Sequence, residues 1–328
     1  MTTMKSVAEA NITSGQKVVV RCDLDVPVSR HEIQEKYRLT ASLETLRYII
    51  SKGATPVIIG HMGSPKGKKD ERLSTEQLRP FFDTELGAGK YELLENVRFD
   101  KGEEENDVQY ARKLAAHGQL YVNESFATSH RNHASIVKIT EWLPSYAGFR
   151  FLKEIENLNH LLTDVKRLFV VVIGGAKLES KLPVVKKFLK DADFVLLGGK
   201  LGMEWKEYVP FNLVLPEDYA PENKDIGNKT IAKYVEIIEK AGTILWAGPM
   251  GAYEEPEYSL GTAQIAKAIA KKTSEGAYTV IGGGDTITAV NSYSLLDKFS
   301  FVSTGGGAML QYLATKTLPA IEALNRKR

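Results

Sequence analysis

The sequence predicts an α/β protein of two domains, each a parallel sheet with helices on both faces, joined by a helical hinge. Two observations predict this fold class. Strand-like apolar runs alternate with helical patterns along most of the chain, and such alternation is typical of parallel sheets covered by helices. The length of 328 residues also suits two domains of roughly 150 residues each. Each half should therefore form a Rossmann-like, three-layer α/β domain.

Apolar residues in the first half alternate between strand and helix spacing. Leu43, Leu46 and Ile49, for example, fall on one face of a helix. Ser74 stands before another helical pattern and is a favourable N-cap residue. We expect strands at 17–22, 55–60, 91–94 and 120–123, and helices at 39–51, 74–86 and 107–116.

A longer helical pattern at 149–163 separates the two halves. Its apolar residues recur at helical spacing: Leu152, Ile155, Leu158, Leu161 and Leu162. We expect a connecting helix here, which places the domains at 1–150 and 151–317. The second half should contain strands at 168–173, 194–198, 243–247, 278–281 and 299–303, and helices at 179–190, 229–241, 261–272, 286–296 and 308–314.

Composition narrows the class of protein. A content of 43% hydrophobic and 26% charged residues allows two buried cores. A net charge of +2 is too small to indicate a nucleic-acid partner. The single cysteine, Cys22, excludes an intramolecular disulfide and should be a buried strand thiol. The segment 1–13 lacks the apolar core of a signal peptide, and no run reaches membrane-spanning length, so we expect a cytoplasmic protein without membrane contact.

Three glycine-rich turns mark the second half. They are Gly174-Gly175-Ala176-Lys177, Gly282-Gly283-Gly284-Asp285-Thr286 and Gly305-Gly306-Gly307, and each lies between an apolar run and a helical pattern. A turn without Cβ atoms lets backbone N–H groups converge on an anion, and the helix N-terminus adds its positive end. A single such turn is also common in ordinary loops. Three of them, two with Lys or Asp, predict a polyphosphate site with a metal ion.

Charged and polar side chains stand at the ends of the apolar runs of the first half. In an open α/β sheet these ends line the ligand crevice. Arginines gathered there suit a small phosphorylated or carboxylated anion, because a guanidinium pairs with such groups in bidentate fashion. The candidates are Arg21, Asp23, Asp25, Arg38, His61, Lys66, Arg98, His130, Arg131 and His133.

Longer motifs run through both halves in a fixed order. The first half contains Arg21-Cys22-Asp23-Leu24-Asp25-Val26-Pro27, His61-Met62-Gly63-Ser64-Pro65-Lys66-Gly67, Leu93-Leu94-Glu95-Asn96-Val97-Arg98-Phe99 and His130-Arg131-Asn132-His133-Ala134-Ser135. The second half adds Trp246-Ala247-Gly248-Pro249-Met250-Gly251 and Ser303-Thr304-Gly305-Gly306-Gly307-Ala308 to the glycine turns. From residue 18 to about residue 324, this series closely resembles the phosphoglycerate kinase family.

The resemblance implies reversible phosphoryl transfer between 1,3-bisphosphoglycerate with MgADP and 3-phosphoglycerate with MgATP. It implies that domain 1–150 binds the triose phosphate and domain 151–317 the nucleotide, that 318–328 packs back on the first domain, and that the chain is a monomer.

The resemblance also assigns site residues. It places Asp23, Asp25, Arg38, His61, Ser64, Arg98 and Arg131 in the triose-phosphate pocket. It places Gly174, Gly175, Lys177, Lys181, Gly198, Gly199, Pro249, Glu254, Gly282, Gly283, Gly284, Asp285 and Thr286 at the nucleotide, with Asp285 as the Mg²⁺ ligand. It assigns catalysis to Arg38, Lys177, Lys181, Gly284 and Gly306. Simpler interpretations stay open: the arginines could form salt bridges, the lysines a solvated face, and Asp285 a helix cap.

Five features depart from the family pattern. Asp25 and Ala247 each replace an asparagine, Ser64 replaces an arginine, and Ser180 replaces an aspartate; Gly202 to Ile226 stands in place of a helix and a strand. These departures keep two alternatives open: a catalytically weak or regulatory homologue, and an acyl-phosphate kinase with another carboxylate acceptor.

A dehydrogenase is disfavoured because its GxGxxG motif, followed by an acidic residue, is missing from the glycine turns. RNA binding is disfavoured because the chain has no basic stripe interleaved with aromatic residues.

Overall fold

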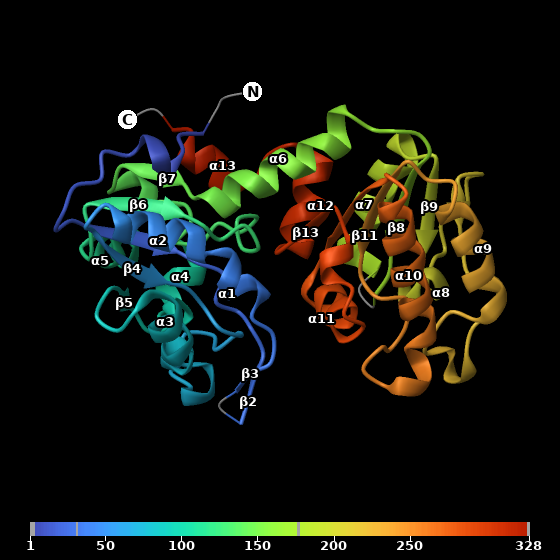
Figure 1. Cartoon of the computed structure of the whole chain (residues 1–328), viewed down its shortest axis with the longest axis horizontal. Coiled ribbons are helices and arrows are strands. Elements are labelled where there is room, and N and C mark those ends of the chain that lie inside the picture. The colour runs from blue at the N-terminus through green and yellow to red at the C-terminus, as the bar shows by residue number, and fades with distance from the viewer. Residues whose placement is uncertain (1–3, 31, 176–177, 327–328) are drawn as a thin grey trace. The chain divides into compact units, whose positions relative to one another are not determined.

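A computed structural model of the chain describes residues 4–30, 32–175 and 178–326 (Figure 1). The chain divides into two compact units. The N-terminal unit is Met1–Ile155 with Thr317–Arg328, and the C-terminal unit is Glu156–Lys316. Within the described residues, no helix has the length and apolar character needed to cross a membrane.

The N-terminal unit is built on a five-stranded parallel sheet of order β5-β4-β1-β6-β7. The chain first adds β4 and β5 on one side of β1, and later adds β6 and β7 on the other side. The order in which strands are added therefore reverses between β1 and β6. β1 is Lys17–Arg21, β4 is Thr55–Ile59, β5 is Glu92–Leu93, β6 is Leu120–Asn123 and β7 is Ser145–Ala147. β7 and a small antiparallel pair, β2 (Val28–Ser29) with β3 (Glu32–Ile33), are not among the predicted strands.

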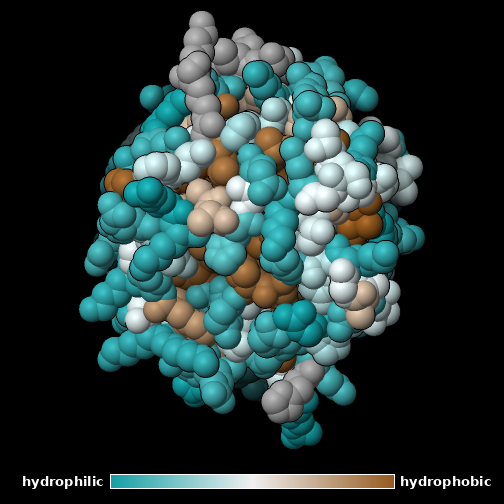
Figure 2. Space-filling model, turned by 90° about the vertical axis from the view of Figure 1, so that its left-hand side faces the viewer, coloured by the Kyte–Doolittle hydropathy of each residue, from teal (hydrophilic) through white to brown (hydrophobic). Residues whose placement is uncertain are grey.

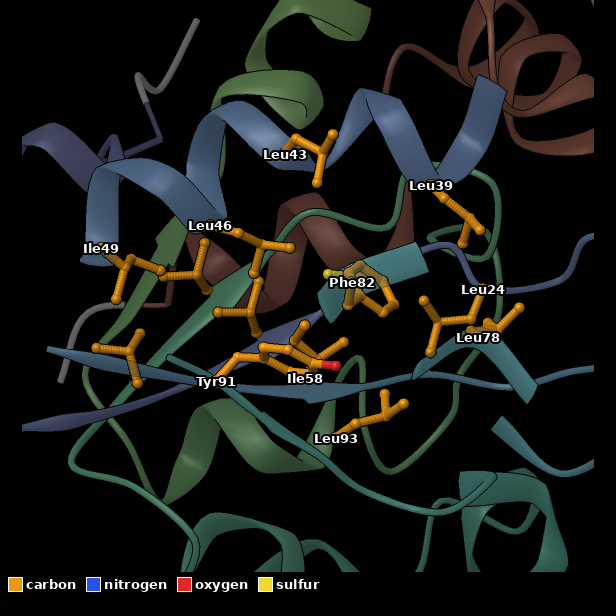
Figure 3. Close-up of a cluster of buried hydrophobic side chains, with 14 of the residues drawn as sticks. Leu24, Leu39, Leu43, Leu46, Ile49, Ile58, Leu78, Phe82, Tyr91 and Leu93 are labelled. Atoms are coloured by element: carbon orange, nitrogen blue, oxygen red, sulfur yellow. The ribbon is translucent and has the colours of Figure 1, made fainter. Parts of the chain in front are cut away.

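Alternate residues of these strands face two separate cores. Val18 and Val20 of β1 belong to a cluster with α2 (Leu43–Ser51) and α3 (Arg79–Leu86). Figure 3 shows the α2 and α3 side chains Leu43, Leu46, Ile49 and Phe82 gathered against Ile58 and Tyr91. Val19 faces the other way, into a cluster with α5 (Val108–Ala115). The sheet is therefore the middle of three layers. The face of the molecule shown in Figure 2 carries mainly hydrophilic residues with some apolar ones among them.

Local polar bonds decide where the helices of this unit begin and break. The helix predicted at 39–51 is divided at Ser42 into α1 (Tyr37–Ala41) and α2, because the Ser42 hydroxyl donates to the Leu39 carbonyl (2.8 Å). The helix predicted at 74–86 begins as a 3₁₀ turn, Thr75–Leu78, and Ser74 caps it as predicted, accepting from the Glu76 N–H (3.2 Å). A short helix, α4 (Lys101–Glu104), was not predicted.

The C-terminal unit contains a six-stranded parallel sheet of order β10-β9-β8-β11-β12-β13. Here too the order in which strands are added reverses, between β8 and β11. The strands are β8 (Phe169–Ile173), β9 (Phe194–Leu197), β10 (Leu213–Val214), β11 (Thr243–Ala247), β12 (Tyr278–Gly282) and β13 (Phe301–Ser303). β8 and β11 are buried along their whole length, as expected when helices cover both faces. The predicted α/β fold class with two parallel sheets is confirmed.

Helices connect these strands. They are α7 (Leu178–Asp191), α8 (Gly199–Met203), α9 (Asn228–Ile238), α10 (Leu260–Ser274), α11 (Gly284–Ser292) and α12 (Gly306–Thr315). α11 ends earlier than predicted because Ser294 adopts a left-handed backbone (φ 56°), which a helix does not accommodate. β10 lies within the segment Gly202 to Ile226 and is not among the predicted strands; its Leu213 pairs with Val195 of β9.

The helix predicted at 149–163 forms as α6 (Phe149–Thr163), and the unit boundary lies within it, after Ile155. Its first turn is anchored in the N-terminal unit by the buried Glu124, whose carboxyl oxygens accept from the Arg150 N–H (3.1 Å) and the Phe151 N–H (3.4 Å). The final helix, α13 (Pro319–Leu324), belongs to the same unit, and the Ala320 N–H donates to the Ser129 carbonyl (3.2 Å).

Glu124 predicts a pH dependence of stability. Burial raises the pKa of its carboxyl to about 8 in the folded chain, from an ordinary 4.5. The folded state therefore binds this proton more tightly, so the stability that it contributes is complete below about pH 4.5 and lost as the pH rises to about 8. The slope is at most about 1.4 kcal/mol per pH unit.

Replacing the carboxyl tests this expectation. Glu124→Gln should flatten the fall in unfolding free energy between pH 5 and 8, measured by urea denaturation at several pH values. Glu44→Gln, at an exposed position on α2, is the control and should leave the slope as it is in the unaltered chain. An unchanged slope in Glu124→Gln would contradict the assignment.

Candidate active site

The chemistry-bearing residues of the N-terminal unit lie at the carboxyl ends of its parallel strands. Arg21 ends β1, His61 follows β4, and the segment 124–133 follows β6. The order in which strands are added reverses between β1 and β6, and open α/β sheets bind ligands beside such a reversal. The topology thus gathers side chains that are more than 100 positions apart in sequence, as the 102 positions between Asp23 and Ser125 illustrate.

Asp23 joins β1 to the loop after β6. Its carboxylate accepts from the Ser125 hydroxyl and from the Ala127 N–H (3.0 Å). Asp23 is buried, with 5% of its surface exposed. Both carboxylate oxygens are therefore engaged by protein donors, and Asp23 shapes the loop that carries His130 and Arg131.

Asp25 organises the loop after β4. Its carboxylate accepts from the Gly63 N–H (2.8 Å) and lies 3.7 Å from Nε2 of His61. Its backbone carbonyl accepts from Nη1 of Arg38 (2.7 Å). The second carboxylate that departs from the family pattern thus has local donors, and it fixes the loop next to Ser64, whose side chain is exposed.

Two further arginines lie in the same region and differ in burial and in their bonds to the protein. Arg98 is buried, its Nη1 donates to the Gly63 carbonyl (2.8 Å), and its Nε lies 3.6 Å from Glu104. Burial lowers the pKa of Arg98, and the charge of Arg21 lowers it further. Arg131 is exposed, and its guanidinium has no hydrogen bond or ion pair in the part of the chain that is described.

Two histidines complete this group. Burial lowers the pKa of His130 to about 4 and that of His133 to about 3, with neighbouring arginines adding to the effect. Both rings are therefore neutral at pH 7. Nδ1 of each ring and Nε of Arg98 are buried without a hydrogen-bond partner among the described residues. Buried polar atoms are ordinarily satisfied, so these three atoms indicate a site for a ligand or water.

Arg21 corrects one sequence-based expectation. Its position at the end of β1 suggested an anion-binding arginine, but it has 0% exposed surface and donates to protein atoms, including Ser135 and His61. It is therefore part of the support beneath the site. Cys22 follows it and is fully buried, as predicted, and burial raises the pKa of its thiol.

In the C-terminal unit, the glycine turns follow β8, β12 and β13, and two more glycines, Gly198 and Gly199, follow β9. All of these strands are parallel, so the turns lie along one edge of the sheet. Each of the three turns leads into a helix, α7, α11 or α12, as the sequence predicts. Helix N-termini gathered in this way favour the binding of an anion.

The tightest contact of this edge lies at the reversal between β8 and β11. Gly248 has φ +97°, and a Cβ there would collide with the Gly174 carbonyl oxygen and lie 2.9 Å from Nζ of Lys181. Nζ of Lys181 donates to the same Gly174 carbonyl. Lys181 therefore lies directly beside Gly174 and Gly248. Lys177 and the side chain of Ser180 lie outside the described residues.

A second close approach joins the turns after β12 and β13. A Cβ on Gly306 would lie 2.6 Å from Cα of Gly283, which itself has φ +105°. The first turns of α11 and α12, at Gly284 and Gly306, therefore begin side by side. The Thr286 hydroxyl accepts from the Gly248 N–H (2.7 Å) and ties α11 to the end of β11.

Asp285 lies exposed in the first turn of α11. The N-cap of that helix is Gly283, so the structure does not support Asp285 as the cap. Burial lowers the pKa of Lys181, and the negative charge of Asp285 opposes that shift. A carboxylate and an ammonium group thus face the glycine edge together.

Pro249 and Glu254 lie in the segment after β11. Pro249 is buried and Glu254 is exposed. Burial raises the pKa of the neighbouring Tyr253 to about 12, and the charges of Glu254 and Asp285 contribute. Tyr253 therefore lies near both carboxylates. Lys186 and Lys187 of α7 pair with Glu207 and Asp191 at the surface, as a solvated face should.

Sequence reasoning missed several residues of these sites. Gly248 lies within a quoted motif but was not assigned a role. Ser125 and Glu103 were also missed, and only the fold shows that they contact Asp23 and Ser135. Asp225, buried, accepts from the Gly261 N–H (2.7 Å) and holds the start of α10.

Comparison with known proteins gives a consistent result. The family model described as phosphoglycerate kinase matches residues 7–88, 82–212 and 211–316. The phosphoglycerate kinase of Borrelia garinii subsp. bavariensis is 33% identical over 394 aligned positions, which cover 98% of this chain and 100% of the relative. That of Leptospira biflexa is 35% identical, covering 94% and 96%. Because the first alignment is longer than this chain of 328 residues, that relative contains segments that this chain lacks.

Solved structures agree. The phosphoglycerate kinase of Pyrococcus horikoshii superposes with a TM-score of 0.85 at 29% identity, covering 98% of each chain. That of Coxiella burnetii gives 0.79 at 29% identity, covering 98% of this chain and 99% of the other. The motifs, both sheets and these likenesses extend over nearly the whole chain, and the chain belongs to the phosphoglycerate kinase family.

Proposed function

We propose that this chain catalyses the reversible transfer of a phosphoryl group between ATP and the carboxylate of 3-phosphoglycerate. The observation that carries the proposal is the pair of sites at the reversals of the two sheets. One site gathers arginines and neutral histidines around buried nitrogen atoms that have no hydrogen-bond partner among the described residues. The other gathers glycine turns, helix N-termini and Lys181. A small anion suits the first site and a nucleotide polyphosphate the second, which corresponds to the two substrates of the family.

In the N-terminal unit, the triose phosphate would bind to cationic groups that the protein leaves accessible. Arg131 is exposed and Arg38 is half-buried, so their guanidinium groups are available for a phosphate or carboxylate. Arg98 and His61 are fixed beside Gly63 and Asp25, where they would orient the bound anion. Asp23 and Asp25 would shape the binding loops, and the exposed Ser64 would lie at the rim of the binding site.

In the C-terminal unit, the phosphate chain would lie along the glycine edge. Backbone N–H groups at the first turns of α11 and α12, at Gly284 and Gly306, would donate to phosphate oxygens. Lys181 would neutralise the oxygens of the transferred group, together with Lys177. Gly198, Gly199 and Pro249 would border the nucleoside, and Glu254 would accept hydrogen bonds from its ribose hydroxyls.

Phosphoryl transfer depends mainly on alignment and on positive charge around the oxygens of the group in flight. The residues assigned here would supply both, with Arg38 on the side of the acceptor and Lys181 on the side of the donor. Because the two sites belong to separate units, transfer requires the substrates to approach each other. We include closure through α6, a monomeric state and a cytoplasmic location in the proposal on the strength of the family resemblance.

Asp285 fits a role as protein ligand for Mg²⁺. Its carboxylate is exposed at the glycine edge near Lys181, and Mg²⁺ on a nucleotide commonly takes one or two carboxylates together with phosphate oxygens and water. Among the described residues, no group of three His, Cys, Asp or Glu side chains could hold a metal without the nucleotide. The ion would supply charge neutralisation on the phosphates.

A coupled assay of ATP-dependent phosphorylation of 3-phosphoglycerate tests the proposal directly. Turnover by the purified chain supports it. ATP binding without turnover would favour a regulatory homologue, and turnover with another carboxylate, but not with 3-phosphoglycerate, would favour a different acceptor. Asp25 and Ser64 are the departures that lie on the acceptor side.

The two cations predicted to stabilise the transition state give a kinetic test. Arg38→Ala and Lys181→Ala should each lower kcat by about 10²-fold or more, the scale of one lost transition-state donor. Binding of the separate substrates should change much less. Arg47→Ala and Lys190→Ala, at exposed positions, are the controls. A raised KM with normal kcat in either test variant would mean that the residue serves uniform binding.

The metal assignment gives a separate binding test. Asp285→Asn should weaken MgATP far more than metal-free ATP, because the carboxylate interacts with the cation. Calorimetric titration with both forms of the nucleotide measures the difference, and Asp297→Asn, at an exposed position, is the control. An equal loss for the two forms would remove Asp285 from the metal site.

A further inference from the structure

Arg21 is a completely buried arginine that links three parts of the N-terminal unit. Its Nε donates to the Ser135 hydroxyl (3.0 Å), Nη1 to the Cys22 carbonyl, and Nη2 to Nδ1 of His61 (3.0 Å). Its exposed fraction is 0%. A small molecule bound at the surface of this site therefore does not reach it, and its donors are already directed at protein atoms.

The charge of Arg21 is balanced through Ser135 by Glu103. Glu103, in α4, is also 0% exposed. Its carboxylate accepts from the Ser135 hydroxyl (2.6 Å) and the Ser135 N–H (2.9 Å). Burial raises the pKa of Glu103, while the positive charge of Arg21 opposes that shift. The series Glu103, Ser135, Arg21 and His61 is thus a continuous buried chain of hydrogen-bonded groups.

This chain decides which nitrogen of His61 carries the proton. A guanidinium group has only donors, so Nδ1 of His61 must accept from Arg21. The proton of the neutral ring is therefore on Nε2. Burial and the charge of Arg21 keep the pKa of His61 well below its usual value, so the ring is neutral at pH 7. Nε2 faces the site, 3.7 Å from the Asp25 carboxylate.

We propose that Arg21, held by Glu103 through Ser135, is a positioning residue that fixes His61 as an Nε2–H donor to the triose-phosphate anion. The inference rests on the proposed function, because it assumes that His61 contacts this substrate. Without Arg21, the proton of the ring could occupy either nitrogen, and the ring could turn. A neutral donor of fixed direction recognises an oxyanion at any pH above the pKa of the ring.

The test must separate this role from simple stability. Arg21→Met alone leaves the buried Glu103 without its countercharge, and an unpaired buried charge is strongly destabilising. The double variant Arg21→Met/Glu103→Gln removes both charges and should recover much of the lost melting temperature. Arg72→Met, which removes an exposed arginine with 89% of its side chain accessible, is the control.

The primary measurement is the tautomer of His61 in the full chain, read by ¹⁵N NMR at pH 7. The chain has six histidines, and loss of a signal in His61→Ala identifies the relevant ring. We expect pure Nε2–H in the unaltered chain and in Arg72→Met, and a mixture of both tautomers in the folded double variant. A folded double variant with pure Nε2–H would overturn the proposal.

Kinetics supply the second measurement. The double variant should raise KM for 3-phosphoglycerate roughly tenfold, the scale of one hydrogen bond, with KM for ATP unchanged. An altered tautomer with unchanged KM for 3-phosphoglycerate would also overturn the proposal. The proposed function fails separately: if the unaltered chain shows no turnover of 3-phosphoglycerate, the tautomer measurement still decides whether Arg21 sets the state of His61.

Discussion

The close approach of two backbone segments, where the strand order of the C-terminal sheet reverses, is the constraint on which the proposed nucleotide site depends. The turns after β8 and β11 lie so near each other that a side chain at Gly248 would strike the Gly174 carbonyl. This contact leaves room beside both turns for the ammonium group of Lys181. The N–H groups of both glycines donate within the protein, that of Gly174 to the Ala247 carbonyl (3.0 Å) and that of Gly248 to the Thr286 hydroxyl (2.7 Å). The close packing of the two turns and the position of the Lys181 charge are therefore consequences of one local geometry.

In the N-terminal unit, side chains and not glycines occupy the strand ends next to the corresponding reversal. Its sheet has the same kind of reversal, but the groups at the strand ends are charged and several are buried, among them Arg21, Asp23, Arg98 and Glu103. Buried charges are tolerated when they are paired and hydrogen-bonded. All four charged groups have protein partners, although Nε of Arg98 makes no hydrogen bond. Burying these charged groups costs desolvation free energy. Their retention is consistent with a site that needs hydrogen-bond donors in a fixed arrangement.

Much of the fold could be predicted because its signals are local. The strand at 120–123 and the helix at 149–163 lie where apolar spacing placed them, and the glycine turns precede helices. The failures have equally local causes: the Ser42 hydroxyl divides one helix, and the left-handed Ser294 shortens another. Two-residue strands such as β10 are too short to show a period.

The site was less predictable because its contacts are distant in sequence. Motifs indicated Asp23 and His61, yet nothing in the sequence pairs Asp23 with Ser125 or Arg21 with Ser135, which are 102 and 114 positions apart. For the same reason, Arg21 was interpreted as a ligand contact, whereas the fold buries it completely. Residue type indicates which chemistry is available, and only tertiary packing decides which groups remain free to perform it.

In the proposed function, two separate anion sites, one on each unit, bind the two substrates of a single phosphoryl transfer. Calorimetric titration of Arg98→Ala and Gly248→Ala with 3-phosphoglycerate and with MgATP tests it most directly. We expect Arg98→Ala to lose 3-phosphoglycerate binding and to keep MgATP binding, because Arg98 belongs to the N-terminal site alone. We expect the reverse for Gly248→Ala, whose new Cβ would strike the Gly174 carbonyl and crowd Lys181. If either variant weakened both ligands equally while remaining folded, the division of the two sites would be contradicted.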